Sequence, residues 1–246
     1  MKVAVILPAA GLGTRMGRSS AEKTGTSRKQ FMLLNGAPIF VYTARKFAGT
    51  PDVSEIVIAV RPEDKGWVEE CIAAEKWLKP VRVVEGGDSR QQSVENALAS
   101  VAKDTDLVAV HDAVRPFIDP ETIARVIEEA ADFGAAIVGI VPVDTVKQVT
   151  RVQAHRAKIR STLPRERLVL AQTPQVFRYD LLNRAFASAR EDGFTGTDEA
   201  SLVERLDQVE VSVVLGTDRN IKITKPTDMD LARLFAADES ERKPAA

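Results

Sequence analysis

Hydrophobic and polar positions along the chain fall into two alternating patterns. Short apolar runs, typical of strands buried on both faces of a sheet, stand between segments whose apolar residues are spaced as on one face of a helix. The runs that predict strands are Val3–Leu7, Glu55–Val60, Val81–Val84, Leu107–Val110 and Ala136–Val141. The segments that predict helices are Pro38–Phe47, Glu63–Leu78, one that begins after a cap at Asp88 or Ser89, and one capped by Asp119 with Pro120 at its first position. This alternation predicts an α/β fold with a mostly parallel sheet flanked by helices.

The pattern weakens after Pro142. The later elements we expect are short strands or an extended excursion over Thr145–Val149 and Val152–Ile159, a helix over Arg178–Ala189, strands over Val209–Leu215 and Asn220–Ile223, and a helix from Pro226 to about Phe235. We expect one domain over residues 1–236, with an arm at about residues 145–171 that could form dimer contacts. Residues 237–246 are small and charged, which predicts a disordered tail.

Composition and charge narrow the classes of function. With 246 residues, 44% hydrophobic and 28% charged, the chain is typical of a globular protein with one large domain. The formal net charge of -1 provides no overall field for nucleic acid or a membrane surface, so neither is expected as a partner. No apolar run reaches the length of a membrane span and the chain starts directly with a strand, which predicts a cytoplasmic protein. A single cysteine, Cys71, and two histidines exclude an intrachain disulfide and a Cys- or His-rich metal site.

The first apolar run ends in a glycine-punctuated turn, PAAGLGTR at positions 8–15. Glycine lets the backbone approach an anion closely, and free N–H groups there can cradle its oxygens. The turn is not a P-loop, because no G-K-[ST] follows, and it is a poor dinucleotide fingerprint, because a polar loop follows Gly17. Arg15, Arg28 and Lys29 add cations that could face a polyphosphate. A tight turn followed by a solvated loop is the plainer alternative.

Two further polar turns follow predicted strands, at the edge where ligands of a parallel sheet bind. The stretch GGDSRQQS at positions 86–93 offers donors and an acid for a base or ribose edge, or simply a turn and a helix cap. Asp112 ends a buried strand, where a carboxylate is costly unless it is paired or binds a cation. Asp112 is therefore either a Mg²⁺ ligand or the partner of Arg115 in a buried salt bridge.

Lys222 is a further candidate, because it stands inside an otherwise apolar predicted strand. The chain offers no Cys/His pair and no G-x-S-x-G elbow. Cations for phosphate, a carboxylate for a metal and no obvious nucleophile suit an in-line transfer in which the substrate supplies the nucleophile. Catalysis would then consist of positioning and charge stabilisation.

Taken in order, a series of motifs resembles the 2-C-methyl-D-erythritol 4-phosphate cytidylyltransferase family of the non-mevalonate isoprenoid pathway. The motifs are PAAGLGTRMG, RKQF, GGDSRQQSV, HDAVRPF, DTVK, AQTPQ, TDEAS and NIKIT. The resemblance extends from Val3 to about Phe235 and implies a Rossmann-like nucleotidyltransferase fold with an extended β-arm. It also implies a homodimer joined through that arm, and transfer of CMP from CTP to methylerythritol 4-phosphate with Mg²⁺ and release of pyrophosphate.

The resemblance further implies a role for each matching residue. Arg15 and Lys29 would be catalytic, stabilising the charge that develops on the α-phosphate. The nucleotide would lie against Ala9, Ala10, Gly11 and Gly13, with its cytosine against Gly87, Asp88 and Ser93 and with Arg90 nearby. Asp112 would bind Mg²⁺, with Arg115 beside it, and the methylerythritol phosphate would be surrounded by Thr145, Arg165, Thr173, Thr197 and Lys222. Arg165 and Lys222 would hold its phosphate, although Arg167 is a rival for the first of these positions.

Three other functions fit parts of the sequence. A cytidylyltransferase for another alditol phosphate, such as ribitol 5-phosphate, would share the nucleotide-binding half. A non-catalytic nucleotide-binding module would not require Arg15, Lys29 and Asp112 together. A nicotinamide-dependent dehydrogenase is the weakest alternative, because Arg61 stands at the end of the second strand where that class places an acid.

Overall fold

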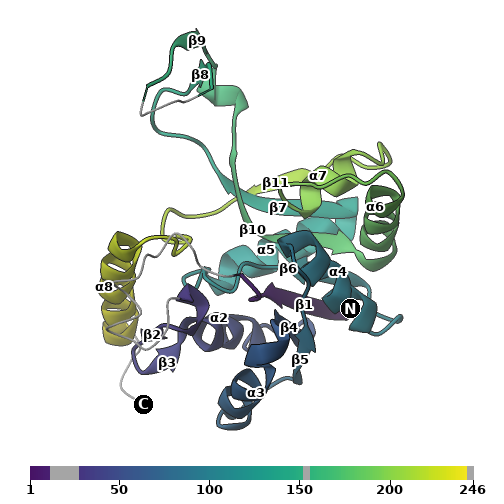
Figure 1. The fold of residues 1–246 in the computed structure, drawn as a ribbon, viewed down its shortest axis with the longest axis vertical. Coiled ribbons are helices and arrows are strands. Elements are labelled where there is room, and N and C mark those ends of the chain that lie inside the picture. The colour runs from purple at the N-terminus through teal and green to yellow at the C-terminus, as the bar shows by residue number, and fades with distance from the viewer. Residues whose placement is uncertain (12–27, 152–155, 243–246) are drawn as a thin grey trace.

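The computed structural model describes residues 1–11, 28–151 and 156–242 (Figure 1). The described residues form a seven-stranded mixed sheet in the order β11-β7-β10-β6-β1-β4-β5. Its strands are β1 (Val3–Pro8), β4 (Val53–Val60), β5 (Val81–Glu85), β6 (Leu107–Val110), β7 (Ala135–Ile140), β10 (Leu170–Arg178) and β11 (Ser212–Leu215). Strand β10 runs antiparallel to both of its neighbours, and the other pairs are parallel. The α/β fold with a mostly parallel sheet is thus confirmed.

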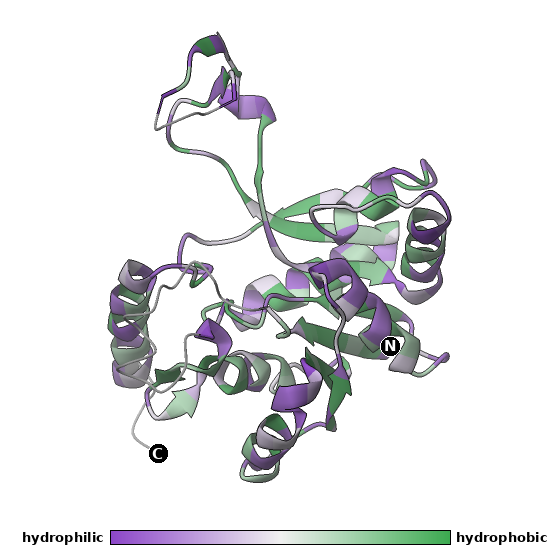
Figure 2. Cartoon of the chain, viewed as in Figure 1, coloured by the Kyte–Doolittle hydropathy of each residue, from purple (hydrophilic) through white to green (hydrophobic). Residues whose placement is uncertain are grey.

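Helices cover both faces of this sheet. They are α2 (Ile39–Ala48), α3 (Lys65–Ala73), α4 (Arg90–Ser100), α5 (Pro120–Phe133), α6 (Tyr179–Glu191) and α7 (Glu199–Glu204), with short 3₁₀ turns η2 (Lys29–Phe31), η3 (Pro62–Asp64) and η4 (Arg165–Arg167). Helix α8 (Pro226–Arg242) packs instead in a separate apolar cluster with Leu34 and Ile39. Alternate residues of each strand point to opposite faces, so Val5 of β1 joins the core under α2, α3 and α5, and Ile6 joins the core under α4, α6 and α7. Figure 2 shows the resulting apolar strands in the interior. Among the described residues, no helix combines the length and the hydropathy that a bilayer crossing requires.

Two helices begin at the capping residues that the sequence predicts. The side chain of Ser89 accepts a hydrogen bond from the Gln92 N–H at the start of α4, and the side chain of Asp119 accepts one from the Thr122 N–H at the start of α5. Helix α3 is shorter than the sequence predicts, because it ends at Ala73. Near this end, the Ile72 carbonyl accepts hydrogen bonds from the Glu75 N–H at 3.1 Å and from the Trp77 indole N–H at 2.8 Å.

The structure of the second half of the chain differs from the sequence prediction in three elements before the tail. Strand β10 and helix α7 are missing from the sequence prediction, since buried polar residues of β10 such as Thr173 and Gln175 break its apolar pattern. The predicted strand Asn220–Ile223 is irregular backbone, held instead through the Ile223 N–H, which donates to the Val114 carbonyl at 3.0 Å.

The expected disordered tail is wrong for its first residues. Helix α8 continues to Arg242, and Glu239 accepts hydrogen bonds from Tyr42 at 2.6 Å and from Lys46 at 2.8 Å. These two contacts tie the end of the helix to α2. Residues 243–246 lie outside the described residues.

A two-stranded arm projects from the sheet. Strands β8 (Lys147–Val149) and β9 (Ile159–Thr162) pair antiparallel to each other in a sheet of their own. Figure 1 shows them well away from the helices that cover the main sheet. This is the region in which the sequence predicts an arm.

Candidate active site

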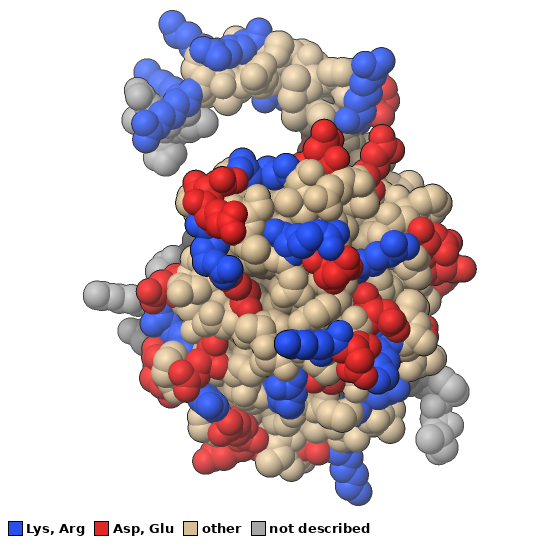
Figure 3. Space-filling model, turned by 90° about the vertical axis from the view of Figure 1, so that its right-hand side faces the viewer, with Lys and Arg blue, Asp and Glu red and all other residues tan. Residues whose placement is uncertain are grey.

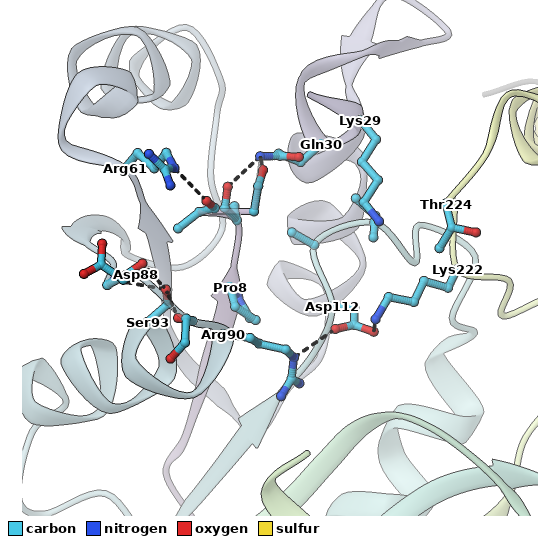
Figure 4. A pocket seen from close by; sticks show the side chains of 17 residues that line it. Pro8, Lys29, Gln30, Arg61, Asp88, Arg90, Ser93, Asp112, Lys222 and Thr224 are labelled. Atoms are coloured by element: carbon cyan, nitrogen blue, oxygen red, sulfur yellow. Dashed lines mark hydrogen bonds and ion pairs between the residues drawn. The ribbon is translucent and has the colours of Figure 1, made fainter. Parts of the chain in front are cut away.

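A cavity of about 380 Å³ lies where the carboxyl ends of β1, β4, β5 and β6 meet (Figure 4). Its position follows the general rule for open α/β sheets. Of the residues predicted from the sequence, those that line it are Ala9, Ala10, Gly11, Lys29, Gly87, Asp88, Arg90, Ser93, Asp112 and Lys222. Segments distant in the sequence therefore form one site. Arg15 and Gly13 lie outside the described residues.

Asp112 is the centre of charge in this cavity. It is 6% exposed, and its Oδ2 lies 2.8 Å from Lys222 Nζ and 3.2 Å from Arg115 Nε. Its Oδ1 lies 3.4 Å from Arg90 Nε. Burial alone would raise the pKa of Asp112, but the charges of Lys222, Arg90 and Arg115 outweigh that effect and hold the pKa well below its usual value. The salt bridge to Arg115, one of the two alternatives from the sequence, is present, and Asp112 is ionised across the physiological range.

Arg90 links Asp112 to a second buried carboxylate. Its two terminal nitrogens donate to the Glu199 carboxylate at 2.7 and 2.9 Å, and Glu199 is 1% exposed. Such a two-point contact fixes the plane of the guanidinium. The sequence marks Glu199 only as part of the TDEAS motif, and its partnership with Arg90 was missed.

A buried chain of hydrogen bonds holds the turn that carries Asp112. The Thr173 hydroxyl accepts from the Asp112 N–H at 3.0 Å and lies 3.1 Å from His111 Nδ1. His111 Nε2 lies 3.0 Å from the Arg115 carbonyl, so the ring carries its proton on Nε2 and accepts from Thr173 on Nδ1. Burial lowers the pKa of His111 to about 4, so the ring is neutral near pH 7. Thr173 is predicted as a substrate residue, but in the structure its hydroxyl bonds to His111 and to the backbone of Asp112, behind the cavity.

The other wall of the cavity is built around Ser93. Its hydroxyl accepts from the Gly87 N–H at 3.0 Å and donates to the Ser89 carbonyl at 2.8 Å. A Cβ atom at Gly86 would lie 2.8 Å from the Ala10 Cβ and 2.9 Å from the Ser93 hydroxyl, so this position requires glycine. The turn that follows β5 is thereby pressed against the end of β1.

The end of β1 is held by two side chains that the sequence reading did not single out as site residues. Gln30 donates to the carbonyls of Ala9 and Gly11, and Arg61 donates to the carbonyl of Ala10. Lys29 and Lys222 extend into the same cavity from two different segments (Figure 4). The cavity thus combines positive side chains with a glycine-containing strand end, an arrangement suited to a polyphosphate.

Four residues that the sequence predicts to bind the substrate lie outside the cavity. Arg115 lies behind the cavity wall, where it also donates to the Asn220 carbonyl at 2.7 Å. Thr197 is exposed on the loop before α7. Thr145 and Arg165 are exposed at the arm, where Arg165 donates to the Val143 carbonyl, and its rival Arg167 lies on the same 3₁₀ turn. Neither these four residues nor Thr173 is among the residues that line the cavity.

An open α/β sheet with a cationic, glycine-edged cavity at its strand ends defines a nucleotide- or phosphate-binding α/β protein. The profile of the 2-C-methyl-D-erythritol 4-phosphate cytidylyltransferase family matches residues 3–237. The chain is 68% identical to the 2-C-methyl-D-erythritol 4-phosphate cytidylyltransferase of Solibacter usitatus and 54% identical to that of Acidobacterium capsulatum, with coverage of 98% of this chain in both cases and of 98% and 100% of those relatives.

Solved structures agree with these sequence matches. The crystal structure of the enzyme of the same name from Thermus thermophilus is 33% identical, with a TM-score of 0.74 and coverage of 96% of this chain and 100% of that one. The structure of 4-diphosphocytidyl-2C-methyl-D-erythritol synthase from Anaerococcus prevotii superimposes with a TM-score of 0.80 at 24% identity, over 96% of each chain, and supports the fold. The chain belongs to the 2-C-methyl-D-erythritol 4-phosphate cytidylyltransferase family, as its motifs suggest.

Proposed function

We propose that the chain carries out the reaction of its family in the cavity at the strand ends. CTP and 2-C-methyl-D-erythritol 4-phosphate are converted to 4-diphosphocytidyl-2-C-methyl-D-erythritol and pyrophosphate. An oxygen of the methylerythritol phosphate attacks the α-phosphorus of CTP, and the bond from that phosphorus to the oxygen shared with the β-phosphate breaks. The attacking group is already an anion, so no side chain has to remove a proton. The observation that carries this proposal is that Lys222 and Arg90 both pair with the buried Asp112, while Lys29 lines the same cavity of about 380 Å³.

The nucleotide is bound by the turns after β1 and β5. Ala9, Ala10 and Gly11 lie against its triphosphate, and Gly87, Asp88 and Ser93 lie against its cytosine, with Arg90 beside them. Lys29 contributes the positive charge that the α-phosphate requires as the transition state forms. Arg15 and Gly13 join this set from outside the described residues.

The methylerythritol phosphate is held on the opposite side of the cavity. Lys222 supplies positive charge to it within the cavity, and Arg115 supplies positive charge from behind the cavity wall. Asp112 positions both cations through its Oδ2. Thr173 and Thr197 complete this side, Thr173 through its contact with the Asp112 backbone.

We assign Thr145 and Arg165 to the active site of a second copy of the chain, in a homodimer. A two-stranded hairpin is marginally stable in water without a surface to pack on. The arm also exposes apolar side chains, including Val143 at 79% and Ile159 at 64%. Figure 3 shows Lys and Arg side chains at several places along the arm, which suits a segment that delivers a guanidinium to a substrate phosphate in the partner.

The residues of the cavity fit Mg²⁺ as a companion of the nucleotide. Mg²⁺ is commonly held by one or two carboxylates together with substrate phosphates and water. Among the described residues, Asp112 Oδ1 makes only the long 3.4 Å contact to Arg90, which leaves this oxygen able to contact a metal ion. Within the described residues, no group of three or more His, Cys, Asp or Glu is placed to hold a metal ion, so the phosphates of CTP would supply most of the ligands. When bound, the ion would neutralise part of the triphosphate charge.

The acceptor is tested by assaying pyrophosphate release from CTP and Mg²⁺ with either methylerythritol 4-phosphate or ribitol 5-phosphate. We expect turnover with the first substrate. Turnover with ribitol 5-phosphate alone would contradict the proposed acceptor. Binding of CTP without turnover of either substrate would indicate a nucleotide-binding module instead of an enzyme.

A further inference from the structure

Three consecutive backbone carbonyls at the end of β1 are each held by a side chain from elsewhere in the chain. Gln30 donates from Nε2 to the carbonyl oxygens of Ala9, at 2.7 Å, and Gly11, at 2.9 Å. Arg61 donates from Nε to the carbonyl oxygen of Ala10 at 3.1 Å. Figure 4 shows the two side chains reaching this backbone from opposite sides. The proposed reaction gives neither of them a role.

Gln30 is itself rigidly placed. Its side chain is 2% exposed, and it follows Lys29 directly in η2. The same short turn is anchored by Phe31, whose ring packs edge-on against Phe40 and Trp67, with centroids 5.9 and 4.9 Å apart. A single rigid segment therefore carries both the catalytic amine and the amide that holds the end of β1.

Holding these carbonyls fixes the direction of the neighbouring N–H groups. A trans peptide unit is planar and its N–H points away from its C=O, so the contact to Ala9 fixes the Ala10 N–H and the contact to Ala10 fixes the Gly11 N–H. Within residues 1–11, 28–151 and 156–242, neither N–H donates to a protein acceptor. Counting the described part of the chain alone, a Cβ atom on Gly11 would meet nothing within 4 Å, so these residues leave room beside this backbone. Backbone N–H groups of this kind bind phosphate oxygens.

We propose that Gln30 and Arg61 are positioning residues that aim the Ala10 and Gly11 N–H groups at the phosphates of the nucleotide. Gln30 also ties Lys29 to this backbone, so that the amine and the two amides reach the polyphosphate together. The inference rests on the proposed function, because it takes CTP as the ligand of the cavity. It predicts that the clamp supports the binding of phosphates and leaves the binding of the base unchanged.

The first test removes the Gln30 donors with Gln30→Met, which keeps the side chain close to its original size. The affinities of the full chain for CTP with Mg²⁺ and for cytidine are measured by calorimetry and ligand-observed NMR. We expect the affinity for CTP to fall about tenfold, as for the loss of buried hydrogen bonds, and the affinity for cytidine to stay within about twofold. Unchanged affinity for CTP, or equal losses for both ligands, would overturn the proposal.

The second test uses Arg61, so that the proposal stays falsifiable if Gln30→Met does not fold. Arg61→Met removes the donor to the Ala10 carbonyl, and Arg61→Lys restores a donor. Glu63→Gln is the matched control, because Glu63 pairs with Arg61 at 3.3 Å without touching Ala10. We expect weaker CTP binding in Arg61→Met, recovery in Arg61→Lys and no change in Glu63→Gln. Wild-type affinity for CTP in Arg61→Met would contradict the proposal.

Failure of the proposed function is distinguishable from failure of this inference. If wild-type protein binds CTP but forms no product, the proposed reaction is refuted. The clamp remains testable in that case, because its measurement is the difference in affinity between CTP and cytidine.

Discussion

The cavity and the arm differ in how far their side chains are buried and paired within one chain. Around the cavity, Asp112 and Glu199 are buried and paired with cations from distant segments of the same chain. In the arm, β8 and β9 are exposed along their whole length. The first region is organised before any ligand arrives, which is the condition for electrostatic catalysis. The second region has the features of a part that is completed by another surface.

In the proposed reaction, this difference divides the substrates between the two regions. The residues assigned to CTP lie together within one chain, apart from the two outside the described residues. The residues assigned to methylerythritol phosphate are split between the cavity and the arm. One chain should therefore bind CTP by itself, and recognition of the acceptor should depend on the arm.

The largest expected effect is that of Lys29→Ala on turnover. Removing one donor to the transition state lowers kcat by about a hundredfold or more. CTP affinity should change much less, and steady-state kinetics separates the two effects. Lys76→Ala, at an exposed lysine outside the cavity, is the control and should behave as wild type. A change confined to KM would show instead that Lys29 acts in ground-state binding.

Arg165→Ala sharpens the comparison from the side of the arm. Loss of a charged contact to the acceptor phosphate should raise the KM for methylerythritol 4-phosphate by about tenfold to a hundredfold. CTP affinity should stay at the wild-type value, because the proposed nucleotide site lies in the cavity and not at the arm. The matched variant Arg167→Ala should have little effect. A larger effect of Arg167→Ala than of Arg165→Ala would reverse the choice between the two residues.

The buried His111 predicts a loss of stability in mild acid. Its pKa in the folded chain is lowered to about 4 from an ordinary value of about 6.5, so as the pH falls the unfolded chain takes up the proton first. The contribution of the neutral His111 ring to the free energy of unfolding is therefore fully present above about pH 7 and is lost as the pH falls toward 4. Between pH 7.5 and pH 5 it corresponds to about 2 kcal/mol of unfolding free energy, measurable by urea denaturation.

Two variants isolate this contribution. His111→Gln should reduce the loss of stability between pH 7.5 and pH 5. His155→Ala should retain it, because His155 is the only other histidine and lies outside the described residues. An equal slope in wild type and His111→Gln would contradict the assignment.

The smallest expected effect is that of Ser89→Ala at the N-terminus of α4. The variant removes the side-chain acceptor of the Gln92 N–H and should cost about 1 kcal/mol of stability. Thermal unfolding measures it, with Ser54→Ala as a comparison at a serine that caps no helix and donates to the Val3 carbonyl. No loss in Ser89→Ala would show that the turn after β5 is held by Ser93 alone.

The sequence predicts the parts of the fold whose pattern is local. The strand Val3–Leu7 and the caps Ser89 and Asp119 depend on residues next to one another, and the structure confirms them. The sequence does not predict strand β10, because several of its buried residues are polar and form hydrogen bonds behind the cavity. The segment Asn220–Ile223 looked like a strand because its apolar residues pack, although its backbone bonds to a loop.

The candidate site also has parts that local sequence patterns predict and parts that they do not. The rule that ligands bind at strand ends was sufficient to bring Gly11, Gly87 and Asp112 together. The partnership of Arg90 with Glu199 joins residues 109 positions apart, and the contact of Gln30 with Ala9 joins residues 21 positions apart. Patterns of neighbouring residues carry no information on such pairs, so only the folded chain shows them.

The central claim is that the cavity of one chain and the arm of another form one active site, and a mixed dimer tests it most directly. Lys29→Ala and Arg165→Ala proteins are each assayed alone and then after being unfolded and refolded together in equal amounts. In a two-fold dimer, half of the refolded dimers are heterodimers, and each heterodimer carries both changes at one site and leaves the other site intact. At limiting methylerythritol 4-phosphate, activity should therefore recover to about a quarter of wild type. No recovery, in a mixture shown to contain heterodimers, would contradict the claim.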